Sequence, residues 1–173
     1  MFFSRINVTK AVRACERARL WSEVVYLYTK DGQVDNAVKT MMERAIAFNA
    51  EKFLDIVVEV RNQELLYKAI AFFVEQLPPL LGKLLSAVMP QLDHTRVVHL
   101  LKTQSEYAVA LAQPYLEDAQ KENLSSVNTV LNDLYLNEED YSSLRSSIED
   151  YPNFDQIVLA QEIESHELLE FRR

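Results

Sequence analysis

Glycine is scarce in this sequence: Gly32 and Gly82 are the only two among 173 residues, whereas an average protein carries about 7%. Tight turns between β-strands depend on glycine, and a phosphate-binding loop needs several glycines close together. Two isolated glycines therefore argue against a sheet protein and against Rossmann and P-loop nucleotide sites. We expect helices joined by short turns.

Cysteine and long apolar runs are also missing. Cys15 is the single cysteine, so the chain forms neither an internal disulfide nor a CxxC metal site, which suits a reducing intracellular setting. No apolar run reaches the roughly 18 residues of a membrane span. The first 18 residues lack the apolar core and cleavage site of a signal peptide.

Positive charge is unevenly distributed within a net charge of −8. Residues 1–68 hold 11 Lys/Arg and 9 Asp/Glu, whereas residues 69–173 hold 7 and 17. Nucleic-acid binding requires a broad basic surface, so no nucleic-acid partner is expected. An acidic partner would bind best near the N-terminal third of this chain. Solvated helix faces explain the basic residues of this region equally well. These residues are Arg5, Lys10, Arg13, Arg17 and Arg19.

Apolar residues recur at helical spacing in two similar stretches, residues 20–42 and 53–76. In the first stretch Asp31-Gly32 ends one helix and another follows, which predicts an antiparallel pair. A shift of 32 residues aligns the two stretches, as expected for a solenoid repeat. Residues 53–60 have the composition of a strand, but the alignment favours a helix. The aligned pairs are Trp21/Phe53, Val24/Ile56, Val25/Val57, Tyr28/Val60, Ala37/Ala69, Val38/Ile70, Met41/Phe73 and Met42/Val74.

Later helix boundaries are marked by prolines and capping residues, giving about ten helices and no convincing strand. Asp93 is expected to cap one helix, Asn137 to cap another that starts with three acids, and Asn153 with Gln156 to form a capping box. Residues 166–173 carry an apolar stripe of Leu168, Leu169 and Phe171, which predicts that further repeats follow.

His94 and His99 form an H-x₄-H pattern that could suggest a metal site. Residues five apart on a helix are rotated by roughly 140°, so the two imidazoles cannot converge on one ion. We expect one histidine near a helix start and the other packed at a repeat junction. His166 has no candidate partner nearby. No metal site and no cofactor are predicted.

The remaining candidates for chemistry have structural interpretations. Three adjacent carboxylates, residues 138–140, point in different directions on a helix, and Cys15 is interpreted as an ordinary helix-face thiol. No nucleophile is marked, although an all-helical enzyme stays open because triads assemble from distant positions. Seven aromatic residues are interpreted as core, with a peptide-binding groove as the alternative: Trp21, Tyr26, Tyr28, Phe53, Tyr67, Phe72 and Phe73.

Long irregular strings in the sequence resemble the clathrin heavy-chain family over essentially all 173 residues. They include residues 1–28, "VDNAVKTMM" at 34–42, "QLDHTRVV" at 91–98, residues 137–161 and "ESHELLEFRR" at 164–173. The resemblance is to the proximal part of the heavy-chain leg. It implies an all-α, right-handed α-solenoid of short antiparallel helix pairs, similar to TPR repeats, and no catalysis.

The resemblance also implies a role and partners. The family forms the struts of coats on vesicles that serve endocytosis and intracellular transport, on the cytoplasmic face of coated pits and vesicles. Its members contact other heavy chains and an acidic helical light chain, and reach membranes only through adaptors. Residues 1–173 are expected to be one solenoid segment, truncated at both ends and monomeric. Light-chain contacts are expected within residues 1–68, with Lys30 and Lys39 as candidates; another endomembrane coat or tethering solenoid is the alternative.

Overall fold

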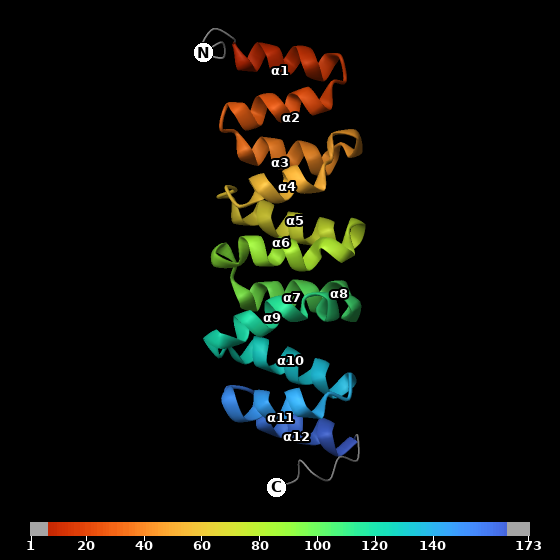
Figure 1. Cartoon of the computed structure of the whole chain (residues 1–173), viewed down its shortest axis with the longest axis vertical. Helices are drawn as coiled ribbons and strands as arrows, with labels where there is room; N and C mark the ends of the chain where they lie inside the picture. The colour runs from red at the N-terminus through yellow and green to blue at the C-terminus, as the bar shows by residue number, and fades with distance from the viewer. Residues whose placement is uncertain (1–6, 166–173) are drawn as a thin grey trace. The chain divides into compact units, whose positions relative to one another are not determined.

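The computed structural model describes residues 7–165, which fall into two compact units divided between Gln76 and Leu77. Over these residues the chain forms twelve α-helices, several short 3₁₀ turns and no strand (Figure 1). The all-α prediction is confirmed. The continuity of the two units as one right-handed solenoid stays a prediction.

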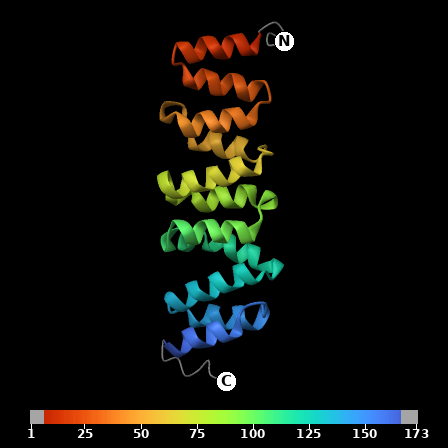
Figure 2. The same cartoon turned by 180° about the vertical axis from the view of Figure 1, so that it is seen from behind.

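The first unit is a series of antiparallel helices in which α2 packs on α1 and α3, and α3 packs also on α4 and α5 (Figures 1 and 2). The turn between the second and third helices contains Gly32 at a φ of +74°, a left-handed conformation that glycine adopts without strain. This confirms the helix end expected at Asp31-Gly32. The helices are α1 (Val8–Arg17), α2 (Trp21–Lys30), α3 (Val34–Glu43), α4 (Ala50–Val57) and α5 (Gln63–Gln76).

The 32-residue alignment holds for the second helix of each pair and only partly for the first. Ala37 in α3 and Ala69 in α5 are both buried, and the residues one and four positions later are buried in both helices. In contrast, α4 begins three residues before its aligned start, because the Asn49 side chain accepts the Lys52 backbone N–H at 2.9 Å and caps the helix there. Consequently Val60 lies outside α4, although residues 53–57 are helical as predicted.

Over residues 77–165, the part of it that the structure describes, the second unit contains seven helices. Asp93 caps the second of them as expected, since its carboxylate accepts the Arg96 N–H at 3.1 Å. The helices are α6 (Leu81–Val88), α7 (His94–Gln104), α8 (Glu106–Leu111), α9 (Gln113–Ala119), α10 (Ser125–Asn137), α11 (Tyr141–Asp150) and α12 (Gln156–Ser165).

Two predicted caps in this unit are wrong. Asn137 ends α10 instead of starting a helix, and Asp140 caps α11 by accepting the Ser143 N–H at 3.1 Å. Asp155, not Asn153, accepts the first N–H groups of α12. The side-chain amide of Asn153 donates instead to the backbone carbonyl of Asn123, 30 residues earlier in the chain. The predicted C-terminal apolar stripe lies outside the described residues.

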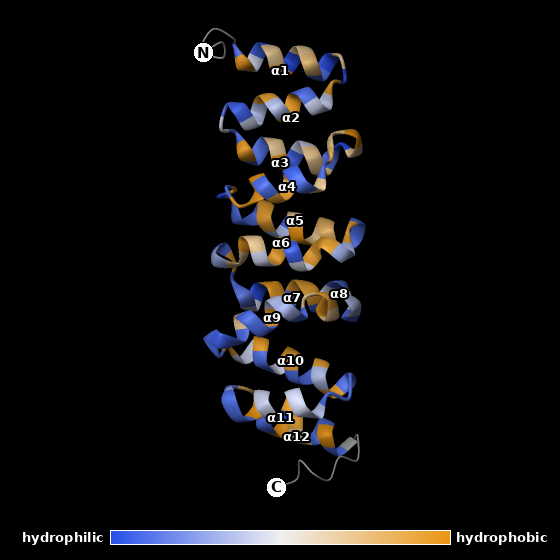
Figure 3. Ribbon diagram, in the orientation of Figure 1, coloured by the Kyte–Doolittle hydropathy of each residue, from blue (hydrophilic) through white to orange (hydrophobic). Residues whose placement is uncertain are grey.

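Hydropathy follows the helix faces within each unit (Figure 3). Most connections are coloured hydrophilic, but the connection after α3 is hydrophobic, with the sequence Ala-Ile-Ala-Phe at residues 45–48. Within residues 7–165 the structure contains no helix that combines the length and the apolar composition needed to cross a membrane.

Candidate partner-binding groove

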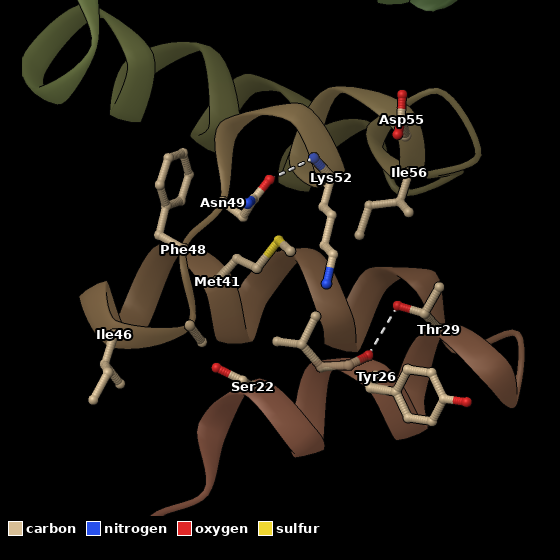
Figure 4. Close-up of a pocket in the computed structure, with 12 residues that line it drawn as sticks. Ser22, Tyr26, Thr29, Met41, Ile46, Phe48, Asn49, Lys52, Asp55 and Ile56 are labelled. Carbon is tan, nitrogen blue, oxygen red and sulfur yellow. Dashed lines mark hydrogen bonds between the residues drawn. The ribbon is translucent and has the colours of Figure 1, made fainter.

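A groove of about 370 Å³ lies in the first unit between α2, α4 and the connection that follows α3 (Figure 4). All of its lining residues belong to this unit. They are Ser22, Val25, Tyr26, Thr29, Met41, Ile46, Ala47, Phe48, Asn49, Lys52, Asp55 and Ile56.

The sequence of the connection explains why the groove forms. Helix α3 ends where Arg44 adopts an extended conformation (φ −128°, ψ 94°), and a 3₁₀ turn follows at Ala45–Ala47. This turn directs Ala47 inward, where it is 6% exposed, and Ile46 outward, where it is 78% exposed. The Arg44 guanidinium lies over the Trp21 ring at 4.3 Å from its centroid, a cation–π contact that ties the connection to α2.

The floor of the groove is apolar and well supported. Val25 and Met41 are buried there. Phe48 contributes one wall, and its ring contacts three other phenylalanine rings, with centroids 5.7 Å from Phe53, 5.5 Å from Phe72 and 6.4 Å from Phe73. Such tilted aromatic contacts hold the wall in place, so the shape of the groove does not depend on an occupant.

The rim carries apolar surface and polar groups together. Tyr26 is 51% exposed, and Figure 4 shows Met41 and the Lys52 side chain lying between Tyr26 and Ile46. The Thr29 hydroxyl donates to its own helix, at 2.8 Å from the Val25 carbonyl oxygen, so it offers a partner only an acceptor. These features suit an apolar side chain flanked by polar atoms.

A positive charge lies at the centre of this rim. The Lys52 ammonium extends toward α2, whereas Asp55 points away from the groove (Figure 4). Over the part of the chain that the structure describes, the Lys52 ammonium forms no ion pair. A carboxylate brought next to it would therefore meet an uncompensated cation.

The structure places the two lysines proposed as light-chain contacts in different surroundings. Lys30 ends α2, and its ammonium lies 5.8 Å from the Tyr26 ring centroid, next to the groove. Lys39 lies in the middle of α3, does not line the groove, and forms an exposed ion pair with Glu43 at 3.9 Å. Their role stays a prediction.

Sequence reasoning missed Lys52 and Ile46. A signal for the groove was available, because four consecutive apolar residues at 45–48 occupy a connection where polar residues are usual. The core interpretation of the aromatic residues is confirmed for Phe53, Tyr67 and Phe73, which are buried, whereas Tyr26 is exposed on the groove.

The two histidines of the H-x₄-H pattern have different environments. His94 begins α7 and is buried, with its Nδ1 2.6 Å from the Tyr115 hydroxyl and its Nε2 3.3 Å from Glu122. A carboxylate only accepts hydrogen bonds, so Nε2–H donates to Glu122, while Nδ1 forms the second hydrogen bond of the ring with the Tyr115 hydroxyl. His99 is exposed, so the expectation that it packs at a junction is wrong. His166 lies outside the described residues.

The other candidates for chemistry take structural roles. Among residues 7–165 no three or more His, Cys, Asp or Glu side chains are grouped so as to hold a metal ion. Cys15 is half-buried and packs against the small core formed by α1 and α2. Hydrogen bonds from Ser143 to Asp140 lower the pKa of that carboxyl, as expected for a cap. Burial, and then the Glu117 carboxylate, raise the pKa of Tyr135.

Comparison with known proteins agrees with this architecture. The family described as "Region in Clathrin and VPS" matches residues 2–81 and 85–173. Relatives include the probable clathrin heavy chain of Schizosaccharomyces pombe, 44% identical over 173 residues, and the clathrin heavy chain of Drosophila melanogaster, 46% identical over 174 residues; each match covers 100% of this chain. Clathrin heavy chain 2 of Homo sapiens is 45% identical over 99% of it.

The chain spans 10% of the length of each of these relatives. The two matched segments, 2–81 and 85–173, correspond closely to the two compact units, which divide after Gln76. Since the match extends over both units and the identity runs along the whole sequence, the chain belongs to the clathrin family of heavy-chain repeats.

Proposed function

We propose that this chain is a structural segment of a clathrin heavy-chain leg and supports assembly of the clathrin coat. The observation that carries the proposal is identity of 44–46% to clathrin heavy chains along the entire chain. The physical role follows from the fold of each unit. Each helix buries apolar surface against its neighbours, which gives a stiff element suited to a strut.

The proposal includes a place and a mode of action. The segment acts on the cytoplasmic face of coated pits and coated vesicles, in endocytosis and intracellular protein transport, and reaches membranes through adaptors. It acts as a scaffold and not as an enzyme, and its proposed partners are other heavy chains of the lattice and a clathrin light chain.

Replacement of the matching segment in a relative's heavy chain tests the scaffold role. If residues 1–173 form a leg segment, a chimaera that carries them should still assemble into coats with purified light chain. As a control, the same heavy chain with this segment deleted should not assemble. A chimaera that folds but forms no coats would contradict the proposal.

The light-chain part of the proposal concerns Lys30 and Lys39. The light chains of this family are acidic, and residues 1–68 hold 11 Lys/Arg against 9 Asp/Glu, whereas residues 69–173 hold 7 against 17. Changing both lysines to Glu should weaken light-chain binding, and higher salt should weaken binding of the unchanged chain, because charges at the surface are screened over about 10 Å at 0.1 M.

Light scattering checks this directly. Alone at micromolar concentration the chain should be a monomer with a mass near 20.0 kDa. With a purified light chain the mass should rise by that of one light chain. A stable trimer, or binding that maps to residues 115–173, would contradict the proposed contacts.

A further inference from the structure

The buried polar side chains of this protein gather in the second unit. Among residues 7–165 the polar side chains that the structure buries are His94, Gln120, Asn128, Asn132 and Ser147, all of which lie after Gln76. A buried polar group opposes folding unless a hydrogen bond replaces the bonds to water that it has lost. Each polar atom of this core therefore needs a partner.

Hydrogen bonds connect most of this polar core. The Gln120 amide donates to the Ser147 hydroxyl at 2.8 Å, and that hydroxyl donates to Oδ1 of Asn132 at 2.6 Å. One turn earlier on α10, the Asn128 amide donates to Oδ1 of Asn123 at 2.7 Å and to a backbone carbonyl of the connection before α12 at 3.0 Å. These bonds join α10 to α11 and to the connections that precede α10 and α12.

Two atoms of α10 remain without a partner in the part of the chain that the structure describes. They are Oδ1 of Asn128 and Nδ2 of Asn132, which belong to residues that are 0% and 1% exposed. A buried donor that lacks an acceptor costs more free energy than a typical hydrogen bond gains. Native proteins usually satisfy such atoms with an ordered water molecule.

A small cavity lies next to one of these atoms. It has a volume of about 10 Å³ and lies between α10, α12 and the connection before α12, with Asn132 in its lining. That volume is roughly the space that one water molecule needs. Because Oδ1 of Asn132 is bonded to Ser147, Nδ2 is the polar atom that this side chain can present to the cavity. The other polar residues of the lining are Thr129, Asp133, Asp155 and Glu162.

We propose that this cavity binds one ordered water molecule, which accepts a hydrogen bond from Nδ2 of Asn132 and donates to the carboxylates of Asp133 and Asp155. Oδ2 of Asp133 is bonded to Lys102 at 3.2 Å, which leaves its Oδ1 for the water. Oδ1 of Asp155 accepts two backbone N–H groups of α12, which leaves its Oδ2. Three hydrogen bonds are typical of a buried water molecule.

A water molecule fits this lining better than a cation does. The carboxylates by themselves would attract a cation, but Asn132 brings an N–H donor to the same cavity, and a donor repels positive charge. Water both accepts and donates, so it satisfies the amide and the carboxylates together. Within residues 7–165 no three or more His, Cys, Asp or Glu side chains are placed to hold a metal ion.

This water makes Asn132 a positioning residue for α12. The apolar residues Leu159 and Ile163, each 6% exposed, bury one face of that helix. The water adds a polar link from α10 to Asp155, the residue that caps α12. The stiffness of this part of the second unit then depends on a polar side chain as well as on apolar packing.

Nuclear Overhauser effects between water and side-chain amides test the site in the ¹⁵N-labelled 173-residue chain. A bound water should give the Asn132 amide protons an effect with the sign of a long-lived contact. Gln120 is the matched control, because its buried amide donates to Ser147 and does not line the cavity. A signal at Asn132 that is no stronger than the one at Gln120 would overturn the proposal.

A high-resolution crystal structure of the same chain gives an independent readout. It should show one water oxygen at about 2.7–3.2 Å from Nδ2 of Asn132, which is the usual hydrogen-bond distance. The proposal is wrong if Nδ2 instead bonds directly to Oδ1 of Asn128, one turn away on α10, or to a carboxylate of the cavity.

Hydrogen exchange of Asn132→Asp tests the positioning role. The new carboxylate still accepts the Ser147 hydroxyl but has no donor for the water, so the backbone amides of α12 should exchange about tenfold faster. The amides of α11, which is held through Ser147, serve as the internal control and should exchange as in the unchanged chain. Unchanged exchange in α12 would mean that Asn132 acts only through Ser147, and the water link would be refuted. If the variant does not fold, the two measurements on the unchanged chain decide.

Discussion

Ala37 lies on the buried face of α3, where its side chain is 0% exposed. Helix α3 packs against α2 on one side and against α4 and α5 on the other, so no free volume is available for a larger residue. Ala37→Phe would force neighbouring side chains from their rotamers or separate the helices. Overpacking of this kind costs about 1–3 kcal/mol.

The size of this effect makes it easy to measure. The first unit has fewer than 80 residues, and each kcal/mol shifts the melting temperature of such a unit by about 4–8 °C. Thermal unfolding followed by circular dichroism should therefore show a loss of several degrees. Ala69→Phe, at the aligned position of α5, should have a similar effect because Ala69 is 1% exposed.

A matched control separates overpacking from the substitution itself. Ala14 is exposed on α1, so Ala14→Phe should leave the melting temperature almost unchanged. An Ala37→Phe variant as stable as the unchanged chain would refute the reasoning, because it would mean that the helices around position 37 are not closely packed.

Three further predictions concern the second unit. Tyr115→Phe removes the hydroxyl that is hydrogen-bonded to the buried His94 and leaves the Nδ1 atom without this partner, so it should lower the free energy of unfolding by about 1–3 kcal/mol in urea titrations. Because the pKa of Tyr135 is raised in the folded chain, the contribution of its neutral hydroxyl to the free energy of unfolding is complete below the usual pKa near 10 and is lost as pH rises above that value. The free energy of unfolding should therefore fall above about pH 10, and it should fall less in Tyr135→Phe. Because the pKa of Asp140 is lowered in the folded chain, the contribution of its carboxylate to the free energy of unfolding is present above the usual pKa of 3.8 and is lost as pH falls below it. Asp140→Ala should therefore be less stable than the unchanged chain at pH 7, and its free energy of unfolding should fall less on acidification. A flat alkaline profile in the unchanged chain, or equal acid sensitivity of the Asp140 variant, would contradict the last two.

Local signals in the sequence predicted the helix boundaries that depend only on neighbouring residues. Asp31-Gly32 ends α2 because the turn needs one left-handed residue, and Asp93 caps α7 because its carboxylate reaches an N–H three residues later. The equivalence of Ala37 and Ala69 was also visible, since close packing of second helices imposes the same small residue in both repeats.

Boundaries that depend on distant residues were not predictable in this way. Asn153 has the composition of a cap, but its amide donates to the Asn123 carbonyl, 30 residues away, and Asp155 takes the capping role. The turn after α10 contains Glu139 at a φ of +58°, which shifts the cap of α11 to Asp140. Several polar residues near each turn could cap the next helix, and contacts with distant parts of the chain decide which of them does so.

The sequence by itself determined that the chain is helical, because scarce glycine and apolar residues at helical spacing leave few alternatives, and it determined the family through long matching strings. Only the tertiary structure decided where the groove between α2, α4 and the connection after α3 forms. Exposure of Ile46 and burial of Ala47 follow from a single 3₁₀ turn held by Arg44 on Trp21, a contact between residues 23 positions apart. Likewise the position of Lys52 over the groove depends on the packing of α4 near α2. Periodicity within one helix says nothing about which helix lies across the groove, and this is why the sequence alone did not single out Lys52.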